Sequence, residues 1–365
     1  MIDEHILKNE EKAVFDLRSL YRKYGYLPYK MSKFEEYEYY IRNKDFLVSD
    51  RIITFNDTNG RLLALKPDVT LSIVKNGEDQ PGCKQKVCYS ENVYRLSENT
   101  RQYKERMQAG LECIGDIDLY DIYEVVSLAA RSLALISGDF VLQISHLGVL
   151  SEVLDRVCGD PQFQQEAVRY LAGKNAHDLR RLCQAHRMAP EKAELLSRFI
   201  SVHGKRDRVL EQLEPICGGE ALTELRELSA LLDRLPESDR ILFDFSVVNN
   251  RNYYNGIVFK GFLSGICGGV LAGGQYDKLM RKLDRKAGAI GFALYLDLLE
   301  QLPAPKHDYD VDVLLLYGPE TDRAAVAAET DRLIAEGKTV SAQRSIPAKL
   351  RYRELVRLGK ERSPC

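Results

Sequence analysis

Asp68 and Thr70 stand directly after Pro67, which ends a predicted strand, so they place a carboxylate and a hydroxyl at the end of that strand. These two groups suit an ammonium ion, because both accept hydrogen bonds and the carboxylate carries the opposite charge. The same residues also suit the start of a helix over "VTLSIVKN", where either side chain could cap the first turn. The residues alone leave both interpretations open.

A second group lies on the predicted strand "MQAGLECIG", where Gln108 and Glu112 are four residues apart. A strand has a side-chain period of two, so both share one face with Gly110, which leaves room above the backbone. This combination indicates the floor of a site for a small polar ligand, or an exposed strand face. Arg95, at the end of the preceding strand, offers a guanidinium to a carboxylate or phosphate, or to a surface ion pair.

Two adjacent tyrosines, Tyr253 and Tyr254, begin a third stretch, "NYYNGIVFK". On a continuous strand, neighbouring side chains point to opposite faces, so one tyrosine would line a pocket while the other packs or reaches the opposite side. Core packing is the other interpretation of either ring. Gly268-Gly269 and Gly273-Gly274 bracket the next strand; they permit close approach of a ligand to the backbone, or form ordinary turns.

Several predicted elements position these residues. Apolar spacing predicts a helix over about Glu4–Tyr24, and Asn59-Gly60 predicts a hairpin between the strands Ile52–Phe55 and Leu62–Leu65. Short amphipathic helices predict a helical insertion over about residues 157–236. The other predicted elements are two strands within residues 86–115, a helix over Leu119–Ser137, a strand from Phe140 leading into a helix near Leu150, strands at Ile241–Val248, Tyr253–Phe262 and Val270–Ala272, a helix over Gln275–Lys286, and a strand-to-helix unit over residues 287–302. Tight connections between adjacent strands favour antiparallel pairing and an α+β fold.

The stretch Leu302–Pro305 has the composition of a linker. Beyond it, residues 308–365 predict a small α/β unit with a buried strand, a helix that Gly337 ends, and a short second strand. The last stretch, "QRSIPAKLRYRELVRLGKER", is basic and predicts a solvated helix, with partner docking or RNA contact as alternatives.

Composition excludes several classes of protein. The chain has 365 residues and a net charge of −2, which argues against a surface built entirely for nucleic acid. Its eight cysteines form no C-x-x-C pair and have no nearby histidine at ligand spacing, so we predict neither a metal site nor a disulfide framework. The absence of a signal-like or membrane-length apolar run favours the cytoplasm. No phosphate-loop, dinucleotide-binding or serine-nucleophile motif is present, and we predict no cofactor.

The order of these groups resembles the catalytic domain of class II histidyl-tRNA synthetases. The stretches that carry the resemblance are "FNDTNGRLLALKPDVT" for a hairpin of that family, "VYRLSENTRQYKERMQAGLECIG" for its motif 2 with Arg95 at the motif arginine, "NYYNGIVFK" and "AGGQYDKL" for its histidine signatures, and "GAIGFALYLDLL" for its motif 3. The resemblance covers roughly Glu4–Leu302. It implies a synthetase-like catalytic-type domain over residues 1–302, an antiparallel sheet flanked by helices, and a truncated anticodon-binding-like unit over residues 308–365.

The resemblance also implies a histidine pocket. Asp68, Thr70 and Gln108 match positions that bind the amino group, while Glu112 and Tyr254 match the imidazole contacts. The complete set of implied ligand-binding residues is Asp68, Thr70, Arg95, Gln108, Glu112, Tyr253 and Tyr254. The set is chemically sensible, because a carboxylate opposes an ammonium, and a glutamate with a tyrosine hydroxyl satisfies both ring nitrogens.

The positions that depart from the synthetase pattern are those that handle ATP. Asn249 stands where the family has the arginine that stabilises the reacting carboxylate and phosphate, and an uncharged amide cannot replace that guanidinium. Leu298 replaces a second arginine, Gln275 a third, and Ser97 a glutamate. We therefore predict that aminoacyl-adenylate chemistry is lost and that the chain has no catalytic residues of its own.

Retained amino-acid positions and altered ATP positions resemble the regulatory subunits of ATP phosphoribosyltransferase, a synthetase-like family of histidine biosynthesis. That resemblance implies a non-catalytic homodimer that joins short-form catalytic subunits in a hetero-oligomer, is needed for their activity, and takes part in feedback by histidine. The alternative is a divergent synthetase or amino-acid-activating paralogue, in which Arg251 or Arg106 substitutes for the missing arginine. A general RNA-binding module is a third alternative, which the near-neutral charge disfavours.

Overall fold

The computed structural model describes residues 7–44, 52–77, 82–96, 101–248, 253–303 and 308–359. The chain divides into two compact units, Met1–Leu302 and Pro303–Cys365. Within the described ranges, no helix is both long enough and apolar enough to cross a membrane. The seven cysteines in those ranges are free thiols.

A nine-stranded sheet organises the first unit. Its strand order is β1-β5-β6-β12-β11-β10-β7-β9-β8, and every neighbouring pair is antiparallel except β1–β5 and β7–β9. The strands are β1 (Leu27–Pro28), β5 (Gln85–Leu96), β6 (Tyr103–Gly115), β7 (Phe140–His146), β8 (His203–Lys205), β9 (Ile241–Asp244), β10 (Ile257–Leu263), β11 (Leu271–Gln275) and β12 (Gly288–Tyr295). This largely antiparallel sheet with flanking helices confirms the α+β prediction.

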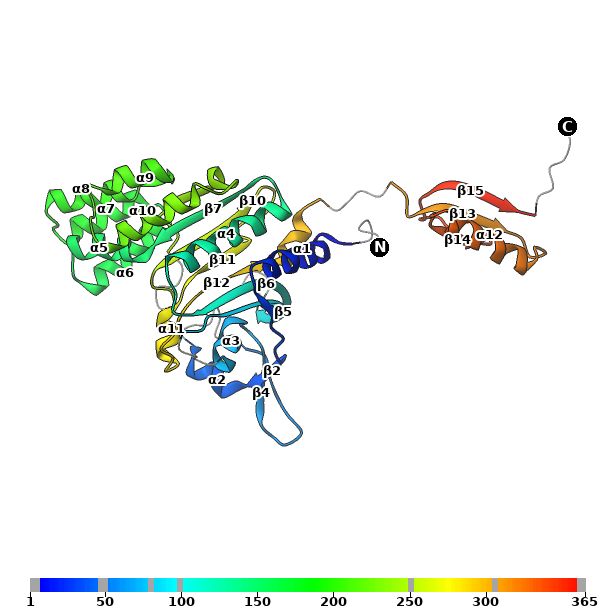
Figure 1. Cartoon of the computed structure of the whole chain (residues 1–365), viewed down its shortest axis with the longest axis horizontal. Helices are drawn as coiled ribbons and strands as arrows, with labels where there is room; N and C mark the ends of the chain where they lie inside the picture. Colours follow the sequence, from blue (N-terminus) through cyan, green and yellow to red (C-terminus); the bar gives the residue numbers. More distant parts are fainter. Residues whose placement is uncertain are drawn as a thin grey trace. The chain divides into compact units, whose positions relative to one another are not determined.

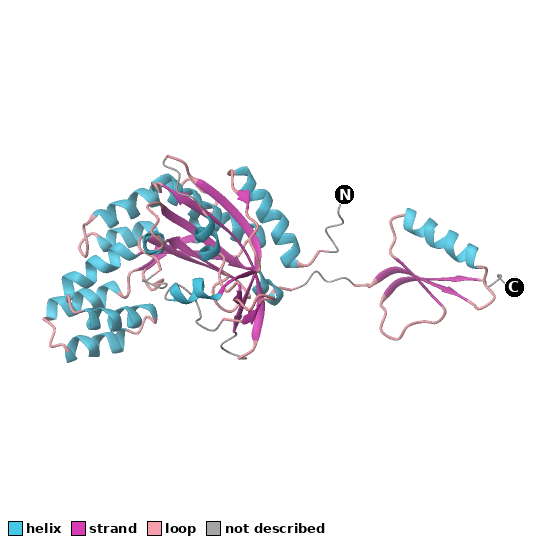
Figure 2. Cartoon of the chain, turned by 90° about the horizontal axis from the view of Figure 1, so that it is seen from below, coloured by secondary structure: helices cyan, strands magenta, loops and turns pink. Residues whose placement is uncertain are grey.

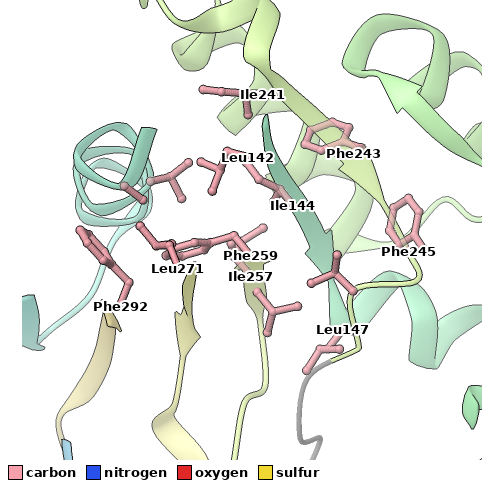
Figure 3. Packing of buried hydrophobic residues seen from close by; sticks show 14 of the residues in the cluster. Leu142, Ile144, Leu147, Ile241, Phe243, Phe245, Ile257, Phe259, Leu271 and Phe292 are labelled. Atoms are coloured by element: carbon pink, nitrogen blue, oxygen red, sulfur yellow. The ribbon is translucent and has the colours of Figure 1, made fainter. Parts of the chain in front are cut away.

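One face of the sheet packs against two long helices, α1 (Asn9–Lys23) and α4 (Leu119–Ile136), as Figure 1 shows. The backbone N–H of Asp121 donates to the side chain of Asp118, which caps α4 as an acidic N-cap residue should. Alternate residues of the central strands, among them Ile144, Phe259 and Phe292, are buried in the main core (Figure 3). The intervening residues of the same strands point to the opposite face.

That opposite face carries a second, smaller core. It includes residues of α2 (Tyr37–Arg42), β4 (Leu62–Leu65), α3 (Thr70–Asn76) and α11 (Asp277–Lys282). β4 is the middle strand of a small sheet with β2 (Phe34–Glu36) and β3 (Thr54–Asn56). The predicted hairpin is confirmed, since β3 and β4 pair antiparallel and the N–H of Gly60 donates to the carbonyl of Asp57. Gly60 has φ of +79°, a conformation that glycine adopts without strain.

Between β7 and β9 the chain forms the predicted helical insertion. Its helices are α5 (Leu147–Val157), α6 (Pro161–Ala172), α7 (Ala176–Ala185), α8 (Pro190–Phe199), α9 (Arg206–Leu213) and α10 (Glu220–Leu232), and a one-turn 3₁₀ helix, η3 (Ser238–Arg240), precedes β9. The sequence predicted helices throughout, but β8 interrupts them and pairs antiparallel with β9 at the edge of the large sheet. Three residues are too few for a period-two pattern to reveal a strand.

Several predicted boundaries around the tyrosine stretch are wrong. β10 begins at Ile257 and not at Tyr253, because Asn255 bonds across to β11 through its N–H while Gly256 passes over the side chain of Gln275. β9 ends at Asp244, and β11 continues to Gln275, so α11 starts only at Asp277. The strand-to-helix unit ends in a 3₁₀ helix, η4 (Leu296–Gln301).

The second unit is a small three-stranded parallel sheet, β13 (Val311–Tyr317), β14 (Val340–Gln343) and β15 (Tyr352–Leu358), with one helix, α12 (Arg323–Ala335). Figure 2 shows the helix along one side of these strands. The predicted solvated helix in the basic stretch is wrong, because residues 352–358 form β15 beside the central strand. β15 pairs in parallel with β13, and Arg351, directly before it, forms an ion pair with Asp310.

Candidate functional site

A cavity of about 490 Å³ lies on the side of the large sheet opposite the main core. All seven residues that the sequence assigned to a ligand line it: Asp68, Thr70, Arg95, Gln108, Glu112, Tyr253 and Tyr254. They come from α3 and the residue pair before it, from β5 and β6, and from the segment before β10. Polar residues far apart in sequence therefore converge on one hollow, as the small-ligand interpretation requires.

Small residues at the centre of the sheet create this hollow. Ala293 on β12 and Ala272 on β11, which both line the cavity, lie side by side in register. In the next row, Gly291 lies beside Glu112. A Cβ at Gly291 would lie 1.8 Å from Oε2 of Glu112, so the carboxylate occupies space that only glycine leaves free.

The room above Gly110 is not open, contrary to the prediction from its small size. A Cβ there would lie 2.6 Å from the hydroxyl oxygen of Tyr89, and that hydroxyl donates to the carbonyl of Phe292 at 3.3 Å. Gly110 therefore admits a tyrosine ring to the cavity wall, and not the ligand directly.

Glu112 is almost completely buried, and both of its carboxyl oxygens have partners. The hydroxyl of Thr70 donates to Oε1 at 2.8 Å, and the hydroxyl of Tyr276 donates to Oε2 at 2.6 Å. Burial raises the pKa of Glu112 to about 8, and the charge of Asp68 adds to the rise, although the two hydrogen bonds oppose it. At neutral pH this carboxyl is therefore mostly protonated in the empty cavity, so it can either donate to a ring nitrogen or accept a ring N–H after ionisation.

Asp68 fills the capping role that the sequence left open, and it also pairs with an arginine at the cavity wall. Its Oδ1 accepts the backbone N–H of Leu71 at 3.0 Å and so stabilises the first turn of α3, while its Oδ2 faces Nη2 of Arg95 at 3.2 Å. The Nε of Arg95 also donates to the carbonyl of Pro67 at 2.7 Å. Thr70 is the first residue of α3, which aims its hydroxyl at Glu112. The helix start thus presents a carboxylate and a hydroxyl to the cavity.

The two adjacent tyrosines line the same cavity, so the predicted division between opposite faces is wrong. Because β10 starts after them, strand alternation does not separate them, and their ring centroids are 4.6 Å apart. Tyr253 also lies 5.7 Å from the ring of Tyr276. Burial holds the pKa of all three hydroxyls well above the usual value, so each remains a neutral donor at physiological pH.

Hydrogen bonds of the two residues that flank Gly256 hold the segment that follows the tyrosine pair. The side chain of Asn255 donates to Asp277 at 2.8 Å, and the backbone N–H of Ile257 donates to Oε1 of Gln275 at 2.7 Å. A Cβ at Gly256 would lie 1.9 Å from that same Oε1, so glycine is required there. Gln275, which the resemblance matches to an arginine of the synthetase signature, thus supports this turn through its amide oxygen.

Sequence reasoning missed three lining residues with polar side chains, Tyr89, Lys260 and Tyr295. Each lies on a central strand and faces the same side as Gly110 or Gln108, so strand parity could have identified them once the pairing was known. The signature "AGGQYDKL" contained Tyr276, but no role was assigned to its ring. Three of these four residues are tyrosines. The chain contains 20 tyrosines, so residue type alone does not identify the ones that line the cavity.

Of the positions predicted to depart from the synthetase pattern, Asn249 and Ser97 lie outside the described residues, as does Arg251. Leu298 lies on η4 and packs against the main core, where it offers no charge to a ligand. Beside it, Oδ2 of Asp297 lies 3.9 Å from Nε of Arg106, and neither residue lines the cavity.

The fold and the cavity together define the chain as a protein of the histidyl-tRNA synthetase family, to which it belongs: the sequence model of that family matches residues 2–299. Solved structures agree on the fold. A histidyl-tRNA synthetase from Nostoc superposes with a TM-score of 0.71 at 17% identity over 93% of this chain and 83% of that one. An ATP phosphoribosyltransferase regulatory subunit/histidyl-tRNA synthetase from Bacillus halodurans reaches 0.78 at 24% identity over 96% and 93%.

Within that family the chain belongs to the ATP phosphoribosyltransferase regulatory subunits. A regulatory subunit from Desulfitobacterium hafniense strain Y51 is 30% identical over 80% of this chain and 76% of the relative. Another, from Oceanobacillus iheyensis, is 27% identical over 88% of this chain and 82% of the relative. These relatives carry the regulatory role in histidine biosynthesis that the residue pattern predicted.

Proposed function

We propose that the chain is a non-catalytic regulatory subunit that binds L-histidine in this cavity and activates a short-form ATP phosphoribosyltransferase catalytic subunit. The observation that carries the ligand assignment is Glu112, a buried carboxyl held by Thr70 and Tyr276 in a cavity that Asp68 also lines. An imidazole meets Glu112 and the tyrosines, while the amino group meets Asp68, Thr70 and Gln108.

Names of relatives support the assembly. The fold of this chain is also found in the ATP phosphoribosyl transferase (HisG:HisZ) complex from Thermotoga maritima, with a TM-score of 0.63 at 20% identity over 79% of this chain and 97% of that one. We propose that two copies of this chain form a homodimer that joins catalytic subunits in a hetero-oligomer, and that histidine in the cavity lowers their activity. Free cysteines suit such an assembly in the reducing cytoplasm.

The proposal also assigns no reaction to this chain. Asparagine at position 249 and leucine at position 298 supply no positive charge for a phosphoryl transition state, which such reactions need. A divergent histidyl-tRNA synthetase is the second candidate. It is favoured by the family model that matches residues 2–299, which is described as histidyl-tRNA synthetase.

Two measurements separate the candidates. Co-purification with a short-form catalytic subunit, followed by assays with and without histidine, should show binding, a gain of activity, and inhibition by histidine. A catalytic subunit that neither binds this chain nor gains activity from it contradicts the regulatory role. Histidine-dependent exchange between ATP and pyrophosphate by the purified chain alone would instead establish the synthetase candidate.

A further inference from the structure

The first turn of the helical insertion is bonded to the segment that carries the two adjacent tyrosines. The backbone N–H of Leu147, the first residue of α5, donates to the carbonyl of Gly256 at 2.9 Å. From the other neighbouring strand, the carbonyl of Gln275 accepts the N–H of Asn255 at 3.1 Å. The turn that directly follows the tyrosine pair is therefore held between β11 and the start of α5.

The side chain of His146 organises this joint. It is only 4% exposed, and its Nδ1 accepts the backbone N–H of Gly148 at 3.0 Å, which caps α5. Because Nδ1 accepts, the ring proton lies on Nε2, which donates to Oε2 of Glu224 on α10 at 3.3 Å. One imidazole thus fastens the first turn of α5 to a helix that lies 78 residues further along the chain.

A glycine lets α10 approach this joint closely. A Cβ at Gly148 would lie 2.8 Å from Cε1 of His146 and 2.9 Å from the Cβ of Ala221 on α10. The imidazole can therefore lie over residue 148 only because that residue has no side chain. The same close approach brings α10 against the first turn of α5, within hydrogen-bond distance of His146.

We propose that His146 is a positioning residue for the ligand site and couples the arrangement of Tyr253 and Tyr254 to the helical insertion. The inference rests on the proposed function, since it concerns the tyrosines that meet the imidazole of the bound histidine. His146 does not itself line the cavity. It acts through the start of α5, whose N–H holds the carbonyl of Gly256, while Glu224 holds the ring of His146 in place.

Shared packing makes this coupling act in both directions. Leu147 and Ile257 lie in one buried core (Figure 3), and Leu225 of α10 belongs to the same core. A bond that favours the tyrosine arrangement that binds histidine must in turn be favoured by bound histidine, by the same free energy. Histidine should therefore slow amide hydrogen exchange in the first turn of α5 and in α10.

Two substitutions remove the bond between His146 and Glu224 from opposite ends, and calorimetry on the full chain measures the effect. Glu224→Ala removes the acceptor, whereas His146→Asn keeps an amide oxygen that can cap α5 but is too short to reach α10. We expect each variant to bind L-histidine roughly threefold to tenfold more weakly, the range that one hydrogen bond accounts for. The double variant should bind no more weakly than the weaker single variant, because all three lack the same bond.

Glu152→Ala is the matched control. The carboxylate of Glu152 also joins α5 to α10, because it accepts the N–H groups of Gly218 and Gly219 at 3.0 and 3.2 Å, but it does so from the second turn of α5. This substitution should lower stability toward urea and leave the affinity for histidine within about twofold.

Hydrogen exchange with and without saturating histidine gives the second measurement. In the unaltered chain, histidine should slow exchange in α10 and also in β6, which carries Glu112. In Glu224→Ala only the protection of β6 should remain.

Three results overturn the inference and leave the histidine site intact. They are equal histidine affinities of Glu224→Ala and Glu152→Ala, losses that add in the double variant, and an unaltered chain that binds histidine without slower exchange in α10. Failure of the unaltered chain to bind histidine at all overturns the proposed ligand itself, and this inference with it.

Discussion

The carboxylate of Glu112 lies directly over Gly291, in the position that a side chain at residue 291 would occupy. The two residues are neighbours on β6 and β12, so the sheet register brings a buried acid and a missing Cβ together. The acid can therefore lie flat against the sheet, within reach of both Thr70 and Tyr276. The position of the Glu112 carboxylate on β6 therefore depends on the small size of residue 291 on β12.

Gly291→Ala should displace the Glu112 carboxylate and weaken histidine binding at least tenfold. The new Cβ would also lie 2.4 Å from the carbonyl of Leu111, and overpacking of this kind typically costs ~1–3 kcal/mol of stability. Calorimetry and urea denaturation measure the two effects. Gly138→Ala is the control, since a Cβ there meets nothing within 4 Å, and it should change neither quantity by much. Full histidine affinity in Gly291→Ala would show that the position of this carboxylate does not matter.

Glu112→Gln should make the empty protein more stable at pH 8 than the unaltered chain. The folded pKa is about 8 and the unfolded value is about 4.3, so the unfolded state loses its proton first as pH rises. The contribution of Glu112 to the free energy of unfolding is therefore fully present below about pH 4.3 and declines as the pH rises toward 8. Glu112→Gln removes the ionisable group, so it should abolish this decline in the free energy of unfolding, which is on the order of a few kcal/mol.

Urea unfolding at pH 5 and pH 8 checks this expectation. The gain from Glu112→Gln should be present at pH 8 and much smaller at pH 5. Glu227→Gln changes an exposed glutamate on α10 and should produce no such pH-dependent difference. An equal effect of Glu112→Gln at both pH values would mean that the carboxyl is already ionised in the folded protein.

Histidine affinity should be greatest between about pH 6.5 and pH 8. In that window Glu112 is protonated, while the imidazole of free histidine, with a pKa near 6.5, is neutral. The one proton needed for a hydrogen bond between the carboxyl and the ring nitrogen is therefore already present. Above pH 8 binding must take up a proton, and below pH 6.5 it must release one, so affinity falls on both sides. Calorimetry in buffers with different heats of ionisation measures the number of protons taken up or released when histidine binds. Glu112→Ala should lower the affinity by ~1–3 kcal/mol and lose the fall above pH 8.

Part of this site could be predicted from sequence, because some signals are local. Gln108 and Glu112 share a face on any regular strand, and Asp68 before a helix is a capping signal wherever it occurs. The tyrosine pair could not be placed, because its faces depended on where β10 starts. That start is set by Gln275, 19 residues beyond Gly256, through contacts that no local pattern records.

The same limit explains the other errors. Tyr89 fills the space above Gly110 only because β5 pairs with β6 in that register. In the second unit, the charged stretch around Arg353 and Arg357 becomes a strand because β13 offers it an edge. Pairing between distant segments overrode local propensity in both cases. The prediction that Leu298 departs from the synthetase pattern needed no strand register, because it compares residue types at one position.

Removal of the second unit by ending the chain at Pro303 should leave histidine binding intact. Every residue that lines the cavity lies between Asp68 and Tyr295, and the first unit has its own core. We expect the affinity of the shortened chain to stay within about twofold, less than 0.5 kcal/mol. A large loss would show that the second unit supports the cavity.

Asn255→Ala should weaken histidine binding although residue 255 does not line the cavity. The side chain donates to Asp277, which also accepts the backbone N–H of Ala289, so the bond links the tyrosine segment to β12. Its loss frees Tyr253 and Tyr254 to leave their packed arrangement, and one buried hydrogen bond is typically worth ~0.5–1.5 kcal/mol. We therefore expect a three- to tenfold loss of affinity for histidine. Asn175→Ala, which removes a helix cap in the insertion, is the control for a general loss of stability. Should both variants weaken binding equally, the effect would belong to stability and not to the position of the tyrosines.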